Sequence, residues 1–100
     1  MKYTRTDNGD ETTLEIEGTL DAVTAPELRP VADELLASRR NPIILDLSSL
    51  RLIDSSGIGL VVMLHKRSDK EYGGKVRIVG LRDQPRAIFR LLRLDRVFPV

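Results

Sequence analysis

A short aliphatic run between two helical stretches is the feature that most restricts how this chain can fold. Ile43, Ile44 and Leu45 are consecutive, and the segments before and after them carry apolar residues at helical spacing. A continuous run of this kind is typical of a strand that is buried on both faces, and such strands belong to parallel sheets. Parallel neighbours need right-handed crossover connections, which the two helical stretches can supply. The run therefore predicts an α/β domain with residues 42–47 as an inner strand.

Periodicity and turn residues divide the rest of the chain into short elements. The predicted strands comprise residues 2–7, 12–17, 42–47 and 75–79, with 98–100 either closing the sheet or packing as a tail. The predicted helices comprise residues 24–38, 55–71 and 85–93. The first helix begins with the capping-box sequence Thr-Ala-Pro-Glu at Thr24–Glu27, and residues 48–54 are predicted as a loop. The expected fold is one α/β domain over residues 1–100, in the order β-β-α-β-α-β-α-β, with a small mixed sheet, an edge hairpin and helices mostly on one face.

The predicted core consists of apolar positions that share one face of each element: Leu14, Ile16, Leu28, Leu35, Ile43, Leu45, Val62, Val76, Ile78 and Leu91. The second helix is unusual, because the five consecutive apolar residues 60–64 go right round it. Either neighbouring helices cover all sides of this run, or part of it forms an apolar patch that a protein partner covers.

The composition excludes several classes of site. The chain has no cysteine and a single histidine, His65, so it offers neither a thiolate nor a histidine-rich metal site, and we expect no metal or cofactor. No apolar run approaches the ~18 residues of a membrane span, and the N-terminus lacks the apolar segment of a signal peptide. We therefore expect a cytoplasmic protein without direct membrane insertion.

Charge is distributed unevenly along the chain. Residues 1–38 carry nine acidic and three basic residues, whereas residues 75–100 carry two acidic and seven basic residues. Either the two ends lie close together and compensate, or the basic end forms a surface for an acidic partner. Nucleic acid is a poor fit, because the four aromatic residues do not interleave with the basic ones.

The segment Asp54-Ser55-Ser56-Gly57 follows the predicted inner strand and opens the second helix. A hydroxyl placed there lies at the carboxyl end of a parallel strand and at a helix N-terminus, where α/β proteins hold ligands and anions. The plainer interpretation is that Asp54 or Ser55 merely caps the helix. Gly57 and Gly59 in the first turn indicate close approach by the sheet, a neighbouring loop or a partner, because glycine is unfavourable inside a helix. Neither a P-loop nor a dinucleotide-binding fingerprint is present.

A catalytic serine is excluded by helix geometry. A nucleophilic Ser55 would need a base, and His65 lies ten residues further along the same predicted helix. Ten helical residues rise about 15 Å. We therefore expect a binding module, not an enzyme.

The segment from Asp46 to Gly59 resembles the central motif of STAS domains, and most of all that of the bacterial anti-sigma factor antagonists. The earlier Gly18-Thr19-Leu20-Asp21 is similar to that family's Gly-Glu-Leu-Asp loop. The stretches 74–80 and 88–94 are similar to its last core strand and helix. The resemblance covers nearly the whole chain.

The resemblance implies a phosphorylation switch. The unphosphorylated protein would bind an anti-sigma factor that is also a serine kinase of the histidine-kinase-like ATPase fold, and so release a sigma factor. The kinase would phosphorylate Ser55 and a phosphoserine phosphatase would reverse this. The residues that the resemblance places in the partner-binding surface are Asp21, Asp54, Ser55, Ser56, Gly57 and Ile58. The alternatives are an anion- or nucleotide-binding STAS module, or a STAS subunit of a larger signalling or lipid-transport assembly.

Overall fold

Four strands form the main sheet, in the order β1-β2-β4-β6, in the computed structural model, which describes residues 1–98. Strands β1 (Tyr3–Asn8) and β2 (Glu11–Ile16) form an antiparallel hairpin at one edge. Strands β4 (Ile43–Asp46) and β6 (Val76–Val79) follow in parallel, with Leu14 paired to Leu45 and Leu45 to Ile78. The predicted edge hairpin and parallel inner strand are therefore confirmed, whereas the predicted burial of the inner strand on both faces is wrong, because Ile44 and Asp46 are only partly buried.

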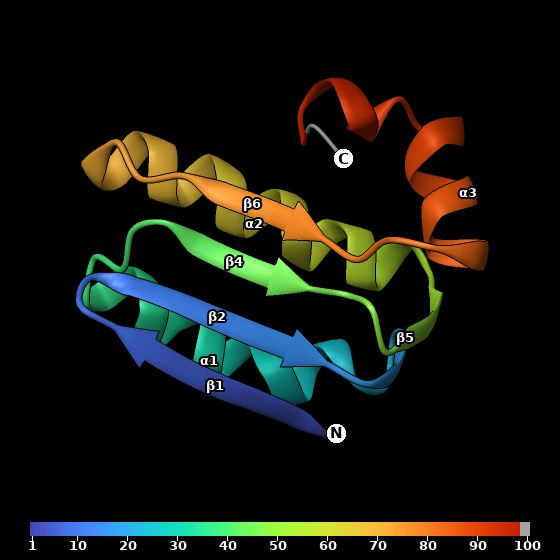
Figure 1. Cartoon of the computed structure of the whole chain (residues 1–100), viewed down its shortest axis with the longest axis horizontal. Coiled ribbons are helices and arrows are strands. Elements are labelled where there is room, and N and C mark those ends of the chain that lie inside the picture. The colour runs from blue at the N-terminus through green and yellow to red at the C-terminus, as the bar shows by residue number, and fades with distance from the viewer. Residues whose placement is uncertain (99–100) are drawn as a thin grey trace.

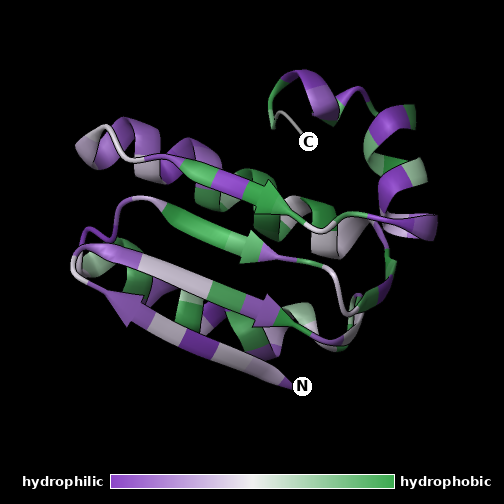
Figure 2. Cartoon of the chain, in the orientation of Figure 1, coloured by the Kyte–Doolittle hydropathy of each residue, from purple (hydrophilic) through white to green (hydrophobic). Residues whose placement is uncertain are grey.

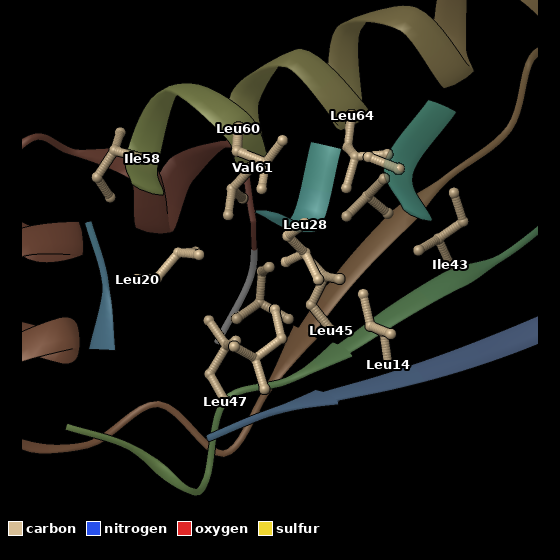
Figure 3. Close-up of a cluster of buried hydrophobic side chains, with 14 of the residues drawn as sticks. Leu14, Leu20, Leu28, Ile43, Leu45, Leu47, Ile58, Leu60, Val61 and Leu64 are labelled. Carbon is tan, nitrogen blue, oxygen red and sulfur yellow. The ribbon is translucent and has the colours of Figure 1, made fainter. Parts of the chain in front are cut away.

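Helices α1 (Ala25–Ala37) and α2 (Ser55–Tyr72) lie together on one face of this sheet, as Figure 1 shows. Figure 2 shows that β4 is apolar along most of its length, as expected for a strand between two others. Side chains of the sheet, such as Leu14 and Leu45, point toward Leu28 of α1 and Leu64 of α2 (Figure 3). All four are at most 1 % exposed, so the core lies between the sheet and the two helices.

A second, two-stranded sheet was not predicted. Strand β3 (Gly18–Leu20) pairs in parallel with β5 (Leu50–Ile53), with Leu20 opposite Ile53. The prediction of a loop over residues 48–54 is wrong for β5. These segments have only three and four residues, too few to establish a strand pattern, and they form strands because they pair with each other and bury Leu20, Leu50 and Ile53.

The first helix does not begin with the predicted capping box. Thr24 is the N-cap residue, but its side chain makes no cap hydrogen bond to the helix backbone. The Thr24 hydroxyl instead donates to the carbonyl of Thr19 at 2.7 Å and accepts from the backbone N–H of Asp21 at 2.9 Å. The capping-box prediction is therefore wrong, because the preceding turn takes the hydroxyl that the helix would have used.

Helix α3 (Asp83–Leu91) and a short 3₁₀ turn (Leu94–Arg96) lie at one end of the molecule, beside β5 (Figure 1). The prediction that Leu91 belongs to the core is wrong, because Leu91 is 75 % exposed, whereas Pro85 and Phe89 are the buried residues of this helix. Phe98 packs as a buried tail residue, and the remainder of the predicted segment 98–100 lies outside the described residues.

The apolar run in α2 is covered mainly from within the domain. Leu60, Val61 and Leu64 are buried, whereas Val62 and Met63 are partly buried against the same core. Val62 thus lies at the edge of the core, and the prediction that it is a core residue is wrong. Among residues 1–98 no helix is long and apolar enough to cross a membrane.

Candidate functional site

Two aspartates lie directly after neighbouring strands, at the same end of the small sheet. Leu20 and Ile53 are paired, so Asp21 and Asp54 follow directly after them. The backbone N–H of Asp54 donates to the carbonyl of Leu20 at 3.1 Å, and this hydrogen bond connects the ends of the two strands. The unpredicted β3–β5 pairing therefore brings together two loops that the sequence analysis had linked only by resemblance.

Asp54 is the N-cap of α2. It has extended backbone angles, and its carboxylate accepts the backbone N–H groups of Ser56 at 2.8 Å and Gly57 at 3.2 Å. Aspartate is among the favoured residues at this position, because it satisfies donors that the helix leaves unpaired. The carboxylate is thus already engaged by the helix start, and it fixes the direction in which the next residues leave the loop.

Gly57 holds the first turn of α2 against β3. A Cβ atom at this position would lie 2.5 Å from the carbonyl oxygen of Leu20 and 2.7 Å from Cγ1 of Ile53. The prediction of close approach is confirmed for Gly57. At Gly59 no other part of the domain comes close, since this residue is exposed and would have no heavy atom within 4 Å of an added Cβ; approach by a partner stays a prediction there.

Ser55 and Ser56 are exposed at the start of α2. The hydroxyl of Ser55 makes no hydrogen bond to another residue in the range 1–98, so it is available to solvent or to a partner. The positive end of the helix dipole favours negative charge at this place, although the N–H groups of Ser56 and Gly57 are already bound by the Asp54 carboxylate.

Asp21 organises the turn that enters α1. Its carboxylate accepts the backbone N–H groups of Val23 at 2.9 Å and Thr24 at 3.0 Å. The two backbone hydrogen bonds lower the pKa of Asp21, because they stabilise the ionised carboxylate. Asp21 therefore contributes a fixed negative charge beside the start of α2.

A shallow hollow of about 460 Å³ lies between the first turns of α1 and α2. Pro26 and Arg29 line it from α1, and Ser56, Gly59 and Met63 line it from α2. The absence of a side chain at Gly59 leaves this hollow open, which accounts for a glycine that packing does not require. Sequence reasoning did not identify Arg29 as part of the site, because helical residues of one element meet another element only in the folded chain.

Gln84 of α3 supports the site from the other side of β5. Its side-chain oxygen accepts the N–H of Ile53 at 2.9 Å, and its side-chain nitrogen donates to the carbonyl of Ile53 at 3.0 Å. Gln84 thus satisfies the free edge of β5 as a neighbouring strand would, immediately before Asp54. No local sequence signal predicts this contact across 31 positions.

The structure brings together the residues that the resemblance had singled out, but not all of them lie on the surface. Asp21, Asp54, Ser55 and Ser56 lie at the exposed end of the small sheet, whereas Gly57 and Ile58 are buried beneath it. Gly57 and Ile58 can position such a surface but offer little area for contact. His65 lies further along α2, where its ring packs edge-on against Phe98 at a centroid distance of 5.0 Å, so it is not beside Ser55.

Comparison with solved structures finds the same fold in bacterial regulatory proteins. A candidate anti-sigma factor antagonist from Thermotoga maritima is 27 % identical, with a TM-score of 0.88 over 96 % of this chain and 82 % of that chain. An anti-sigma factor antagonist from Mycobacterium paratuberculosis has a TM-score of 0.87 at 23 % identity, over 98 % of this chain and 82 % of that chain. The Bacillus cell fate determinant SpoIIAA, in its phosphorylated form, has a TM-score of 0.75 at 20 % identity, over 95 % of this chain and 86 % of that chain. The last two matches show similarity of fold alone.

The family assignment rests on the match of nearly the whole chain to one family model. The model described as "Mlab, STAS domain" matches residues 4–99, which include both aspartate loops and all three helices. The chain therefore belongs to the STAS-domain family.

Proposed function

We propose that this protein is a partner-binding module of the anti-sigma factor antagonist type, switched by phosphorylation of Ser55. In this proposal the unphosphorylated chain binds an anti-sigma factor with serine kinase activity and so releases a sigma factor. The observation that carries the proposal is the exposed Ser55 hydroxyl at the start of α2, next to the Asp54 cap and the Asp21 turn. The family membership and the structural likeness to antagonists support it.

The electrostatics of this position suit a switch that changes binding and leaves the fold intact. A phosphate adds about −1.5 to −2 charge near pH 7. The helix N-terminus favours that charge by about 0.3–1 kcal/mol, while repulsion from the solvated Asp54 is of similar or smaller size. The two effects within the domain largely cancel. Beneath a docked partner the same charge is desolvated, and like charges at an interface cost several kcal/mol.

The experiment compares Ser55→Asp with Ser55→Asn, which has nearly the same size but no charge. We expect Ser55→Asp to keep a near-native melting temperature and to bind the cognate kinase at least tenfold more weakly, which corresponds to about 1.4 kcal/mol. Ser55→Asn should bind more tightly than Ser55→Asp, and Ser55→Ala should bind without being released by kinase and ATP. Phosphopeptide mapping should find phosphate on Ser55, not on Ser56, Ser48 or Ser49.

Two outcomes would overturn this proposal. If Ser55→Asp binds as tightly as the unmodified protein, Ser55 is only the first residue of a helix. If Ser55→Asp unfolds, the position belongs to the structural framework and cannot carry a reversible switch.

A second candidate is a STAS subunit of a larger signalling or lipid-transport assembly that is never phosphorylated. The description of the matching family model as an Mlab STAS domain favours it. The two candidates separate in one experiment, because a constitutive subunit purifies in fixed stoichiometry with its partner whether or not kinase and ATP are present.

A further inference from the structure

The basic end of the chain is not compensated by the acidic end. The ion pairs found among residues 1–98 all lie within residues 1–71, and they use Arg5, Arg29, Arg40 and Arg67 as well as the N-terminal amine. The acidic N-terminal part is therefore neutralised in part by the middle of the chain. The seven basic residues from Lys75 to Arg96 form no ion pair within the described chain.

Helix α3 presents these charges in an ordered way. Its inner side packs against the rest of the domain, since Pro85 and Phe89 are buried. On the outer side Arg86 and Arg90 are four residues apart, and so are Ala87 and Leu91. Residues four apart on a helix are neighbours on one face, so a basic row lies directly beside an apolar row. All four residues are exposed, and Leu91 is exposed by 75 %.

A second apolar side chain is exposed directly after the helix. Leu92 is 49 % exposed, so two large apolar side chains, Leu91 and Leu92, lie beside arginines that form no ion pair among residues 1–98. An exposed apolar strip bordered by charge marks an interaction surface more often than a free surface. We call residues Arg86, Ala87, Arg90, Leu91 and Leu92 the α3 face.

The kind of residue favours a protein over a lipid surface. The charges of the α3 face are arginines, whose planar guanidinium groups bind carboxylates in pairs and are enriched at protein interfaces. A membrane-bound amphipathic helix would need to bury its apolar side in lipid. The side of α3 that carries Phe89, at 0 % exposure, is already buried in the domain, and only the narrow outer row of Ala87 and Leu91 would be left for lipid.

A second copy of this chain is a poorer fit than a different protein. In a second copy, the acidic residues Asp7, Asp33, Glu34 and Glu71 are engaged in ion pairs. The carboxylates of Asp21 and Asp54, which lie near the exposed Val23 and Leu52, already accept backbone N–H groups of their own turns. The free glutamates of β2, such as Glu15, are half-buried on a strand and lack an exposed apolar row beside them.

We propose that the α3 face is a second docking surface, which binds an acidic segment of a partner protein that also carries exposed leucine-like side chains. This surface does not include Ser55, and the proposal stands whether or not Ser55 is phosphorylated. Gln84 of the same helix holds Ile53 directly before Asp54, so a protein docked on α3 lies close to the aspartate loops. A partner could therefore contact both surfaces at once.

The test uses the full chain, labelled with nitrogen-15, and a synthetic helical peptide with glutamate and leucine in two adjacent rows. We expect amide shifts in residues 83–97 on titration, and at least tenfold weaker binding of a peptide with glutamine in place of glutamate. The double variant Arg86→Glu/Arg90→Glu should weaken binding at least tenfold, and Leu91→Gln should weaken it as well. The matched control is Lys66→Glu/Lys70→Glu, because these two exposed lysines are also four residues apart on a helix and form no ion pair in residues 1–98.

Binding that survives charge reversal at Arg86 and Arg90, or that the lysine control weakens equally, would overturn the proposal. Attachment of the chain to phosphatidylglycerol vesicles through the same arginines, without affinity for the peptide, would assign the surface to lipid instead. Self-association that the arginine variant abolishes would assign it to a second copy. Melting temperatures of all variants should stay close to the unmodified value, since none of the substituted side chains is buried.

Discussion

Replacing Gly57 with alanine should destabilise the domain, because this glycine lies where α2 rests on β3. The added Cβ would be 2.5 Å from the Leu20 carbonyl oxygen and 2.7 Å from Cγ1 of Ile53. The carbonyl cannot retreat freely, since it accepts the hydrogen bond from the Asp54 N–H at 3.1 Å. The substitution therefore strains the connection between the two aspartate loops.

The expected magnitude follows from three effects. Overpacking of a close contact costs about 1–3 kcal/mol. Weakening the Asp54–Leu20 hydrogen bond costs about 1 kcal/mol more. The better helix propensity of alanine stabilises the folded state by up to about 1 kcal/mol and offsets part of this loss. The net loss should be about 2 kcal/mol, which lowers the melting temperature of a domain of this size by roughly 8–16 °C.

Gly59→Ala is the matched control in the same helical turn. Its Cβ would meet no heavy atom within 4 Å, so only the gain in helix propensity remains. We expect stabilisation by about 0.5–1 kcal/mol, measured by urea and thermal unfolding of both variants. If Gly57→Ala melts at or above the unmodified temperature, α2 does not rest on β3 as described. If Gly59→Ala loses as much stability as Gly57→Ala, the effect is a general property of the first turn and the packing argument is wrong.

Three further predictions test the core, the helix cap and the aspartate turn. Leu45→Ala removes a side chain that is 1 % exposed and should cost about 2–5 kcal/mol in urea unfolding, whereas a loss under about 1 kcal/mol would contradict the placement of β4. Asp54→Ala should cost about 0.5–2 kcal/mol and Asp54→Asn much less, because asparagine also caps helices; equal losses in thermal unfolding would argue against the cap. The pKa of Asp21 lies below the ordinary value, so its contribution to stability is present at neutral pH and is lost as pH falls through the folded-state pKa. Carboxyl NMR titration should show this lowered pKa, and an ordinary or raised value for Asp21 would contradict the turn geometry.

The strands with strong local patterns could be predicted from the sequence, and the short ones could not. Ile43–Asp46 begins with a continuous aliphatic run, and Val76–Val79 alternates buried and exposed residues. By contrast Gly18–Leu20 has three residues and a glycine with positive φ at its start, so nothing local distinguishes it from a loop. Such strands exist because a partner strand satisfies their backbone, and the partner is distant in the sequence.

The error at Leu91 has a different cause. Helical periodicity puts Leu91 on the same face as Ile88, which is partly buried against the core, but this pattern assumes that the helix packs along its whole length. Helix α3 ends at Leu91 and lies at the end of the molecule, so the last turn extends past the surface that buries Phe89. A residue of core type thus remains exposed, and this departure from the pattern is part of what identifies the α3 face.

The candidate site depends on the small sheet, whereas the core depends on the large one. The side chains at the centre of the core, such as Leu14 and Leu45, belong to the four-stranded sheet. The loops of Asp21 and Asp54 instead follow β3 and β5, which are joined by backbone pairing and by the Gln84 contact to Ile53. The Ser55 side chain takes part in none of these hydrogen bonds. In the proposed switch, we therefore expect a charge added to the Ser55 hydroxyl to change the exposed surface while these hydrogen bonds remain in place.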